Sequence, residues 1–276
     1  MNKLYNLAKK ENLDARSKYL RSLILKGLAN SKKGHVGSSF SMLEIVRVLY
    51  DSFLNTNPKK YNISNRNRLI ISPGWAALAQ YALLIDKKFI KKKEINNYCN
   101  TNAILGGCLD SSTQGVEAST GSCGHGMAIA VGIAKSFKLK KINKIVYVIL
   151  GDGELGEGSI WESAISASKN KLNNLCIIID RNYVQCSGFT NEVSKLDPID
   201  QKWKSFGFHV NELNGHSLTD LKKNLAINLK INKKPTVLVC HTIMSKGIKS
   251  AENSPDWHWK SGISVDVVNK ISTDLK

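Results

Sequence analysis

One stretch of the sequence constrains the fold more than any other. A continuous, mostly β-branched run, Ile145–Leu150, is followed by the glycine-rich turn Gly151–Gly158 and then by a helical pattern from about Ser159 to Asn170. A second apolar run, Leu175–Asp180, comes next. Apolar runs of this kind are typical of strands buried on both faces of a parallel sheet. A strand, a helix and a strand in this order form one crossover unit, so the stretch predicts two neighbouring parallel strands.

The same alternation of helical and strand patterns runs along the rest of the chain. Periodic apolar residues predict five further helices, at Leu13–Asn30, Ser41–Leu54, Ala76–Ile85, Met127–Phe137 and Leu218–Leu229. Short apolar runs predict three further strands, at Arg68–Ser72, Phe208–Leu213 and Thr236–Cys240. No repeat, linker or change of composition divides the chain. We therefore expect an α/β fold, with one parallel sheet covered by helices on both faces, in a single domain spanning residues 1–276.

The composition excludes several classes of protein. Hydrophobic residues make up 42% of the 276 residues, which is too many for an intrinsically disordered chain. The apolar stretch Met127–Ala134 is far shorter than the roughly 20 residues that span a membrane. The first twenty residues are charged and amphipathic, unlike a secretory signal, and the six cysteines have no CxxC spacing. These features predict a cytoplasmic protein with reduced thiols and no membrane partner.

The charge points to anionic ligands more than to nucleic acid. Forty Lys and Arg against 22 Asp and Glu give a formal net charge of +18. Only six of the basic residues are Arg, the side chain that reads guanine edges with two hydrogen bonds, and the lysines are scattered along the chain. We therefore expect no nucleic-acid partner, and the excess charge favours the approach of phosphorylated ligands.

Two polar residues follow the two strands of the constraining stretch. Asp152 lies directly after the first strand, between two glycines, and Asn182 lies just after the second, 182 − 152 = 30 residues later. Thirty residues is the length of one crossover unit, so both side chains are expected at the same edge of the sheet. Carboxylate and amide oxygens are ligands that Mg²⁺ accepts in proteins. The pattern therefore predicts a cation site at the carboxyl edge of the sheet.

At this point a resemblance can be named. The stretch from Gly151 to Gly188, which begins with GDG and passes an Asn after the next strand, resembles the thiamine diphosphate motif of the transketolase family. Three other segments resemble that family in the same order: SKKGHVGSSFSMLEI at Ser31–Ile45, the glycine-rich Gly115–Ser136 and AENSPDWHWK at Ala251–Lys260. The likeness extends from about residue 10 to 265, and it is to the N-terminal part of the family's chain.

The resemblance implies how a thiamine diphosphate cofactor and its cation are held. It assigns Mg²⁺ or Ca²⁺ to Asp152, Asn182 and the main-chain carbonyl of Val184. It assigns the diphosphate to Gly153 and Asn182. Contacts along the cofactor are implied for Ser38, Gly121, Ser122 and Cys123.

The resemblance also implies catalytic residues. His258 would lie over the cofactor, close to the diphosphate and the substrate, and His35 would face the substrate. Glu157 and Glu162 match carboxylates that the family buries at its dimer interface, between two cofactors. The i, i+5 spacing of these two residues does not by itself place them on one helix face, so their assignment depends on the resemblance alone.

Three positions depart from the family pattern on the substrate side. Pro73-Gly74-Trp75 stands where the family has Lys-Gly-His, Gly106-Gly107-Cys108-Leu109 replaces a Gly-His-Pro stretch, and Met244 replaces a lysine near the diphosphate. Each lost cation would ordinarily pair with phosphate or polarise a sugar hydroxyl. Trp75 would fill space used by a sugar or stack on one. We therefore expect a specialised sugar as substrate.

The resemblance implies an enzyme that transfers a two-carbon ketol unit from a ketose to an aldose, both phosphorylated or otherwise activated. In the family, a second domain binds the pyrimidine of the cofactor and supplies a catalytic Glu. We expect that domain and the C-terminal domain on a separate chain, so that this chain is the N-terminal subunit of a split transketolase and forms an α2β2 heterotetramer with its partner.

Two other functions remain open on the sequence alone. The GDG motif also occurs in enzymes that decarboxylate a 2-keto acid and transfer the product to an aldehyde, and product analysis with pyruvate would separate that reaction from ketol transfer. The chain could also be a non-catalytic subunit that retains the fold as a scaffold. The paired Asp152 and Asn182 argue against a scaffold, because nothing else would need cation ligands there.

Overall fold

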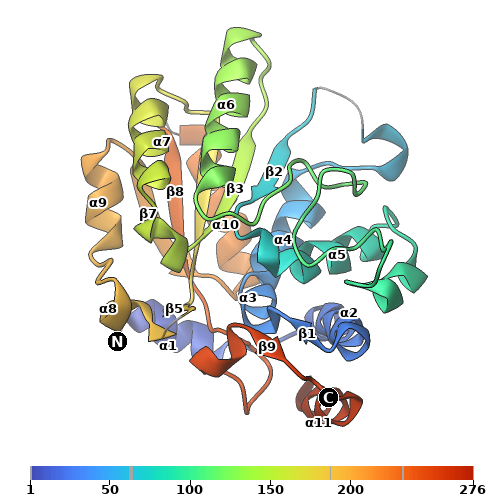
Figure 1. Ribbon diagram of the computed structural model, residues 1–276. Helices are drawn as coiled ribbons and strands as arrows, with labels where there is room; N and C mark the ends of the chain where they lie inside the picture. The colour runs from blue at the N-terminus through green and yellow to red at the C-terminus, as the bar shows by residue number, and fades with distance from the viewer. Residues whose placement is uncertain (1, 62–64, 187, 232, 276) are drawn as a thin grey trace.

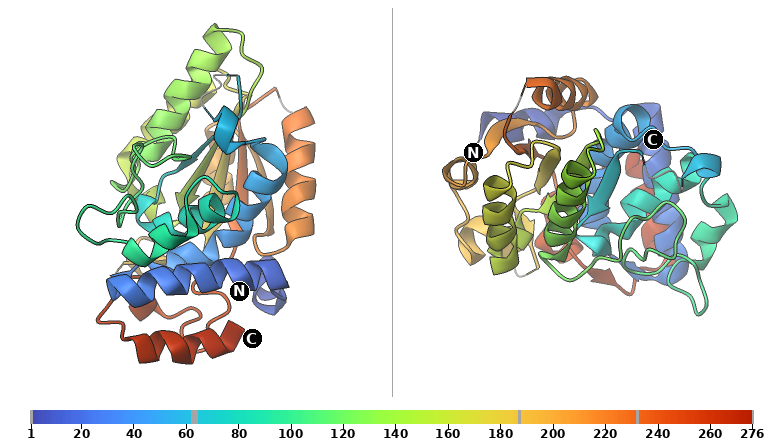
Figure 2. Two further views of the ribbon diagram at one scale, coloured as in Figure 1. Left: turned by 90° about the vertical axis from the view of Figure 1, so that its right-hand side faces the viewer. Right: turned by 90° about the horizontal axis from the view of Figure 1, so that it is seen from above.

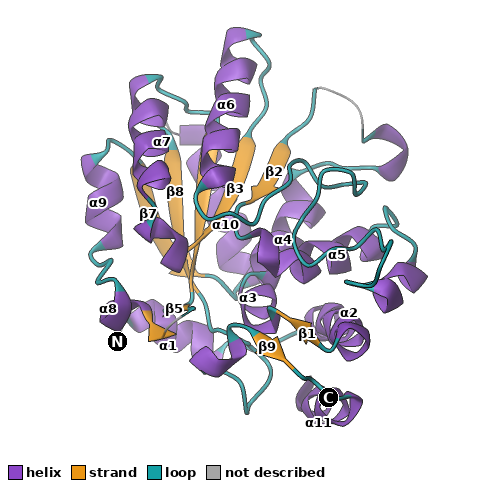
Figure 3. Cartoon of the chain, viewed as in Figure 1, coloured by secondary structure: helices purple, strands orange, loops and turns teal. Residues whose placement is uncertain are grey.

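A central sheet of five parallel strands organises the computed structural model, which describes residues 2–61, 65–186, 188–231 and 233–275. In spatial order the strands are β2 (Arg68–Ile71), β3 (Val146–Gly151), β4 (Leu175–Arg181), β8 (Thr236–His241) and β7 (His209–Asn214). Helices lie on both faces of this sheet (Figures 1 and 3). The predicted α/β class, with a parallel sheet between helical layers, is confirmed.

The register of the sheet brings the two predicted strand ends together. β3 and β4 are parallel neighbours, with Val146 opposite Leu175 and Gly151 opposite Asp180. Asp152 follows directly after β3, and Asn182 follows directly after β4. The expectation that these residues leave neighbouring strands at one edge is therefore confirmed.

One face of the sheet is covered by α6 (His125–Leu139), α7 (Gly158–Lys169) and α9 (Ile199–Ser205); in Figure 1, α6 and α7 stand in front of the strands and α9 lies at the left edge. Side chains along β3 alternate between two cores, as the period of a strand requires. Val146, Val148 and Leu150 belong to the core beneath these helices. The right-hand view of Figure 2 shows α6 and α7 side by side.

The opposite face carries the larger core. Tyr147 and Ile149 of β3 point into it. It is completed by α2 (Ala15–Ser31), α3 (Val36–Ser41), α4 (Leu43–Val48), α5 (Ala77–Asp86) and α10 (Leu218–Ile231). The predicted helix Ser41–Leu54 is interrupted at Met42 and ends as a π-helical turn, Leu49–Phe53.

Several short elements carry no clear pattern in the sequence, and we did not predict them. They are α1 (Lys3–Lys10), β1 (Lys33–Gly34), α3, β5 (Val184–Gln185), β6 (Gly188–Phe189), α8 (Thr190–Val193), α9, β9 (Lys260–Ser261) and α11 (Val265–Ser272). Short 3₁₀ turns occur at Pro58–Lys60, Gly74–Ala76, Lys92–Asn97, Gly153–Gly156, Pro255–Trp257 and Thr273–Leu275. The antiparallel pair β1–β9 matters for the site, because it joins two segments far apart in the sequence. The left-hand view of Figure 2 shows α11 lying beside α2.

A buried ionic network fixes the helices beneath the site. The Arg21 guanidinium donates to both carboxylate oxygens of Glu44, at 2.6 and 2.9 Å. His216 contacts the same carboxylate through Nδ1 at 2.8 Å, and its Nε2 accepts from the Ile243 amide at 2.9 Å. Burial acts to raise the pKa of Glu44, but Arg21 and His216 outweigh it and hold that pKa below its usual value. None of the helices in the described residues has the length and apolar character needed to cross a membrane.

Candidate functional site

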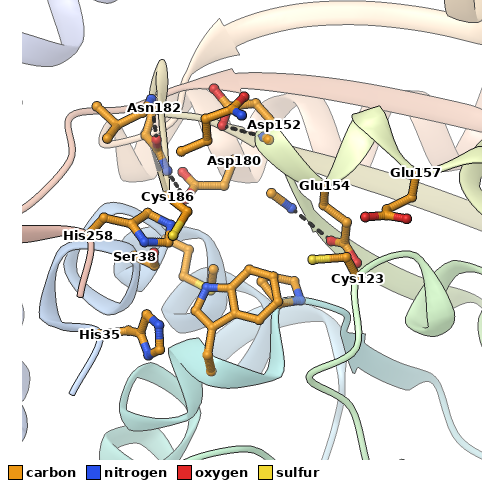
Figure 4. Close-up of a pocket in the computed structure, with 17 residues that line it drawn as sticks. His35, Ser38, Cys123, Asp152, Glu154, Glu157, Asp180, Asn182, Cys186 and His258 are labelled. Atoms are coloured by element: carbon orange, nitrogen blue, oxygen red, sulfur yellow. Dashed lines mark hydrogen bonds between the residues drawn. The ribbon is translucent and has the colours of Figure 1, made fainter. Parts of the chain in front are cut away.

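A cavity of about 370 Å³ opens at the carboxyl ends of β3 and β4 (Figure 4). Its walls come from six regions: the GDG turn, the end of β4 with the loop after it, the N-terminal half of α3 with Met42, the turn after β2, the glycine-rich loop before α6 and the segment before β9. The lining residues are His35, Ser38, Met42, Pro73, Trp75, Cys123, Gly151, Asp152, Gly153, Glu154, Glu157, Asp180, Asn182, Val184, Gln185, Cys186 and His258. Nine residues to which the resemblance assigned a role are in this set.

Asp152 is held firmly at one end of the cavity. Its Oδ1 accepts from the Gly153 amide at 2.8 Å, and its Oδ2 accepts from the Tyr183 amide at 2.7 Å and from Arg181 Nη1 at 3.0 Å. The side chain is 1% exposed. Burial raises the pKa of Asp152, against the opposing effect of Arg181. The carboxylate is thus fixed by two main-chain amides and one cation.

Asn182 is oriented by its neighbours on the same loop. Its Nδ2 donates to Asp180 Oδ2 at 3.0 Å, and its Oδ1 accepts from the Val184 amide at 3.0 Å. Asp180 also accepts from Ser41 Oγ and Thr242 Oγ1, both at 2.5 Å. Burial raises the pKa of Asp180 to about 7. Figure 4 shows Asn182, Asp180 and Asp152 grouped at one end of the cavity.

Glu154 links the GDG turn to the glycine-rich loop before α6. Its carboxylate accepts from the amides of Gly124 and Gly151, at 2.6 and 3.2 Å, and from the Ser72 hydroxyl. Burial raises the pKa of Glu154. Cys123, on the same loop, lines the cavity, and burial, followed by Glu154 and Glu157, raises the pKa of its thiol to about 11. That thiol is therefore protonated at neutral pH.

The other end of the cavity is formed by aromatic rings. The His35 ring lies 5.7 Å from the His258 ring, 6.1 Å from the Trp75 ring and 4.5 Å from the Trp259 ring, measured between centroids. Burial, followed by the proximity of His258, lowers the pKa of His35 to about 4. Burial also lowers the pKa of His258. Both imidazoles are therefore neutral at physiological pH.

The position of Trp75 depends on the preceding residue, Gly74. A Cβ on Gly74 would overlap the main-chain oxygen of Thr120, so only glycine fits there. The 3₁₀ turn Gly74–Ala76 then directs Trp75 to the cavity wall. This ring stands where the resemblance predicts a histidine, and it makes this end of the cavity less polar than the family pattern implies.

Three predicted residues lie outside the cavity lining. Gly121 and Ser122 belong to the loop that carries Cys123, but only Cys123 reaches the cavity wall. Glu162 is exposed on α7, whereas Glu157, also exposed, lines the cavity. The structure therefore separates these two glutamates.

Two of the positions that depart from the family pattern also lie outside the lining. Cys108 is exposed, and its carbonyl accepts from the Tyr81 hydroxyl at 3.1 Å. Met244 is buried, and its Sδ would lie 2.5 Å from a Cβ on Gly37 in α3. Met244 therefore fills space behind the helix that carries Ser38.

Sequence reasoning missed Glu154, Asp180 and Gln185 as lining residues. Glu154 was inside the motif, but its partners Ser72 and Gly124 are too distant in sequence to suggest the contact. Asp180 ends an apolar run, and a charge in that position is a usable signal. Gln185 follows Val184, and a Cβ on Gly153 would lie 2.7 Å from its Cβ, so a residue at position 153 other than glycine would collide with this loop.

The residues present fit a bound diphosphate and cation. Nδ1 of His258 is buried and has no hydrogen-bond partner among the described residues, so a ligand in the cavity can supply one. Within those residues, no group of three or more His, Cys, Asp or Glu side chains is placed to hold a metal ion alone. The candidate donors are instead a carboxylate, an amide oxygen and a main-chain carbonyl, a set that Mg²⁺ completes with phosphate oxygens and water.

Comparisons with known proteins agree with one another. Residues 14–273 match the family model described as "Transketolase, thiamine diphosphate binding domain". An apulose-4-phosphate transketolase subunit of Actinobacillus succinogenes is 38% identical over 258 residues, which cover 93% of each chain. The subunit of the same name from Phocaeicola vulgatus is 36% identical over 248 residues, which cover 90% of this chain and 88% of the relative.

A solved structure extends the likeness to three dimensions. Transketolase from Leishmania mexicana superposes with a TM-score of 0.87 at 26% identity and covers all of this chain. The match takes in 41% of the Leishmania chain, so this chain spans about two-fifths of that relative. The shared part contains the sheet, both helical layers and the cavity at the carboxyl ends of β3 and β4.

Proposed function

This chain belongs to the transketolase family, and from that premise we propose that it is the N-terminal subunit of a split, Mg²⁺-dependent transketolase. Residues 14–273 are the thiamine diphosphate-binding domain of the family. When bound, thiamine diphosphate supplies the nucleophilic carbon to which a two-carbon ketol unit is transferred. The observation that carries the proposal is the pairing of Asp152 with Asn182 at the edge of β3 and β4, beside a cavity with an unpartnered His258 Nδ1 among the described residues.

We assign cation binding to Asp152, Asn182 and the main-chain carbonyl of Val184. The amides of Gly153 and Tyr183 and the Arg181 guanidinium orient the Asp152 carboxylate. Gly153 permits close approach of the diphosphate, because a side chain there would meet Gln185. Ser38 and Cys123 contact the cofactor along the cavity wall, with Gly121 and Ser122 shaping the loop behind Cys123.

We assign substrate orientation to the two histidines. Because His35 is neutral above pH 5, one of its ring nitrogens can accept a hydrogen bond from a sugar hydroxyl while the other donates. Nδ1 of His258, which has no partner among the described residues, is available to the diphosphate or to the substrate. The two imidazoles thus hold the reacting end of a sugar against the cofactor without adding charge to the cavity.

A partner subunit completes the site in this proposal. Among the described residues that line the cavity there is no lysine or arginine, although the chain as a whole has a formal charge of +18. A phosphate on the substrate therefore needs cations from elsewhere. The two relatives that are named as transketolase subunits are matched over 93% and 88% of their length, which supports the same division of the enzyme here. We propose a C-terminal partner with the pyrimidine-binding domain, in an α2β2 assembly.

The assembly also gives Glu157 and Glu162 a role. Glu157 is the residue before α7 and Glu162 lies in its first half, and both side chains are exposed. We propose that this part of α7 contacts a second copy and that the two glutamates are buried there. Their burial would place carboxylates between the two cofactors of the assembly.

For the substrate we propose a specialised ketose phosphate and an aldose acceptor. Two relatives carry apulose 4-phosphate in their names, and this chain shares most of their length. Trp75 at the cavity wall supports a donor other than the common pentose phosphates, because it removes a polar contact and narrows the space. The named relatives also favour ketol transfer over decarboxylation of a 2-keto acid. The six free cysteines support a cytoplasmic location.

Cofactor retention tests the proposal directly. The chain is co-expressed with a candidate C-terminal subunit, and the retention of thiamine diphosphate after gel filtration is measured with and without Mg²⁺. We expect Mg²⁺-dependent retention that is stronger with the partner, together with ketol transfer by the complex and none by the chain alone.

The control variant is Asp152→Ala, for which we expect no retention under any condition. Retention without dependence on Mg²⁺ or on Asp152 would contradict the cation site. If neither the chain nor the complex retains the cofactor, the chain keeps the fold without the chemistry, and the scaffold function becomes the better explanation.

A further inference from the structure

A chain of hydrogen bonds approaches the proposed cation site from behind. The hydroxyl of Tyr183 lies 2.7 Å from His241 Nδ1, and His241 Nε2 lies 2.7 Å from Glu212 Oε2. These hydrogen bonds connect the loop after β4 to the carboxyl end of β8 and to the edge strand β7. Asn2, at the start of α1, closes it with a hydrogen bond from Nδ2 to Glu212 at 3.2 Å.

The direction of these hydrogen bonds follows from the groups themselves. An ionised Glu212 can only accept, so Nε2 of His241 carries the proton. In a neutral imidazole, Nδ1 is then an acceptor, and the Tyr183 hydroxyl donates to it. Burial lowers the pKa of His241, which keeps the ring neutral. Every hydrogen bond in the series therefore has one donor and one acceptor: Tyr183 donates to His241, and His241 donates to Glu212.

Tyr183 stands between two proposed ligands of the cation. It lies between Asn182 and Val184 in the sequence, and its amide donates to Asp152 Oδ2 at 2.7 Å. Its backbone has a φ of +68°, a conformation that residues other than glycine rarely adopt. Something other than local preference must therefore hold this residue in place.

Cavities lie on both sides of the loop, so its packing is incomplete although Asn182 and Val184 are buried. Asn182 lines the cofactor cavity and also a second cavity of about 640 Å³, which is bordered by Tyr183, His241 and Glu212. The ring of Tyr183 has aromatic and cationic neighbours: Tyr5 meets it edge-on at 5.0 Å, and the Arg181 guanidinium lies 4.1 Å from its centroid. Directional hydrogen bonds add to this packing: the Thr190 amide donates to the Tyr183 carbonyl at 3.0 Å, and the Tyr183 hydroxyl contacts His241.

We propose that Tyr183, His241 and Glu212 are positioning residues for the cation site: the hydrogen bond from the Tyr183 hydroxyl to His241 holds the loop so that Asn182 and the carbonyl of Val184 face the cation. This inference rests on the proposed function, since it needs a cation at Asp152 and Asn182. The inference goes beyond the proposed function, because Tyr183, His241 and Glu212 have no proposed contact with the cofactor or the substrate.

The test compares cation affinity with stability. Mg²⁺ is titrated into the complex of the chain and its partner at saturating thiamine diphosphate, and binding is followed by tryptophan fluorescence, for which Trp75 at the cavity wall serves as a reporter. Tyr183→Phe removes one hydroxyl and keeps the ring against Arg181 and Tyr5. We expect the Kd for Mg²⁺ to rise about tenfold, the lower end of what loss of such a supporting contact costs.

The matched control is Tyr50→Phe, which removes another buried hydroxyl, one bonded to Gln80 and the carbonyl of Gly115, away from the cavity. We expect this control to leave the Kd for Mg²⁺ unchanged. Without cofactor, the two variants should unfold at similar temperatures. His241→Phe keeps a ring beside Tyr183 but removes both nitrogens, and it should raise the Kd by a similar factor.

The double variant decides whether the residues act through one bond. If they do, Tyr183→Phe combined with His241→Phe weakens Mg²⁺ binding no more than either change alone. Losses that multiply would overturn the inference, as would an unchanged Kd in Tyr183→Phe or an equal loss in Tyr50→Phe. A wild-type complex that shows no Mg²⁺-dependent signal would overturn the proposed function as well, which distinguishes the two failures.

Discussion

The two ends of the cavity are built in different ways. At the end where we propose cation binding, here called the cation end, Asp152, Asp180 and Asn182 are buried at the edge of two central strands, and their polar side-chain atoms have hydrogen-bond partners within the protein. At the aromatic end, His35 and Trp75 are only partly buried, and the buried Nδ1 of His258 has no partner among the described residues.

We interpret this difference as a division of roles: the cation end binds the cofactor, and the aromatic end selects the sugar. A site held by strand ends and main-chain amides has a fixed geometry, which suits an ion and a diphosphate that are the same in every turnover. Aromatic rings on loops can be substituted at small cost to the stability of the fold, and such substitutions can change which sugar is bound. The cation end accordingly follows the family pattern, and the aromatic end departs from it at Trp75.

The largest effect should come from removing the central acceptor of the cation end. Asp180→Ala leaves the Ser41 hydroxyl, the Thr242 hydroxyl and the Asn182 amide without that acceptor. Each buried donor left unpaired costs roughly 1–3 kcal/mol, so we expect the free energy of unfolding to fall by about 3 kcal/mol. Urea denaturation of the cofactor-free chain measures this change.

Glu157→Ala is the matched control for that measurement. It removes a carboxylate that lines the same cavity but is exposed, and changes of this kind stay within about 0.5 kcal/mol. Equal losses in the two variants would show that the cation end is no more tightly built than the rest of the cavity wall.

The second prediction concerns the charge state of the aromatic end. His35 has a pKa of about 4 in the folded chain, against an ordinary value of 6.5, so between these limits the unfolded state binds a proton that the folded state does not. Stability should therefore decrease as the pH falls from 6.5 towards 4, and should gain nothing from His35 above 6.5. Proton NMR of the cofactor-free chain gives the pKa, and His35→Asn should flatten the stability profile in that range. Titration of His35 near its ordinary pKa would show that the aromatic end is open to water.

Most of the fold could be predicted from the sequence, for a physical reason. Strands such as Ile145–Leu150 are buried on both faces, so every position is apolar and the pattern is unmistakable. The spacing of Asp152 and Asn182 worked because parallel strands bring their carboxyl ends together whatever the details of the helix between them. The prediction of the strands and the prediction that Asp152 and Asn182 lie close together both depended on patterns within a short stretch of sequence.

The contacts that complete the site could not be predicted, since they join short elements without a periodic pattern. The two-residue strands Lys33–Gly34 and Lys260–Ser261 bring His35 beside His258, but neither strand is long enough to carry a signal. Arg181 is the last residue of the buried strand β4, and nothing in the neighbouring sequence indicates that its guanidinium contacts Asp152. The chain from Tyr183 through His241 to Glu212 joins three separate strand ends and is visible only in three dimensions.

The third prediction tests whether specificity can change while the cation end stays intact. Trp75→His introduces the residue that the resemblance predicts at that position and adds a polar group to the cavity wall. In the active complex we expect kcat/KM with xylulose 5-phosphate to rise about tenfold, the value of one good hydrogen bond to a charged or polar group. Mg²⁺-dependent retention of thiamine diphosphate should stay unchanged. A loss of retention as complete as in Asp152→Ala would mean that the two ends of the cavity are one unit.

The smallest effect should come from Trp259, whose side chain is 47% exposed while its ring lies 4.5 Å from that of His35. Trp259→Ala should lower the free energy of unfolding by only about 1 kcal/mol, because about half of the side chain is already exposed. The same variant exposes His35 to water, so the pKa of His35 should rise from about 4 towards 6.5, since burial is the main cause of its low value. The two measurements are informative together because they should diverge: stability changes little, while the pKa of the histidine that we propose to face the substrate changes clearly. If the pKa of His35 stays near 4, its burial comes from His258 and Trp75 instead, and the aromatic end is as rigidly enclosed as the cation end.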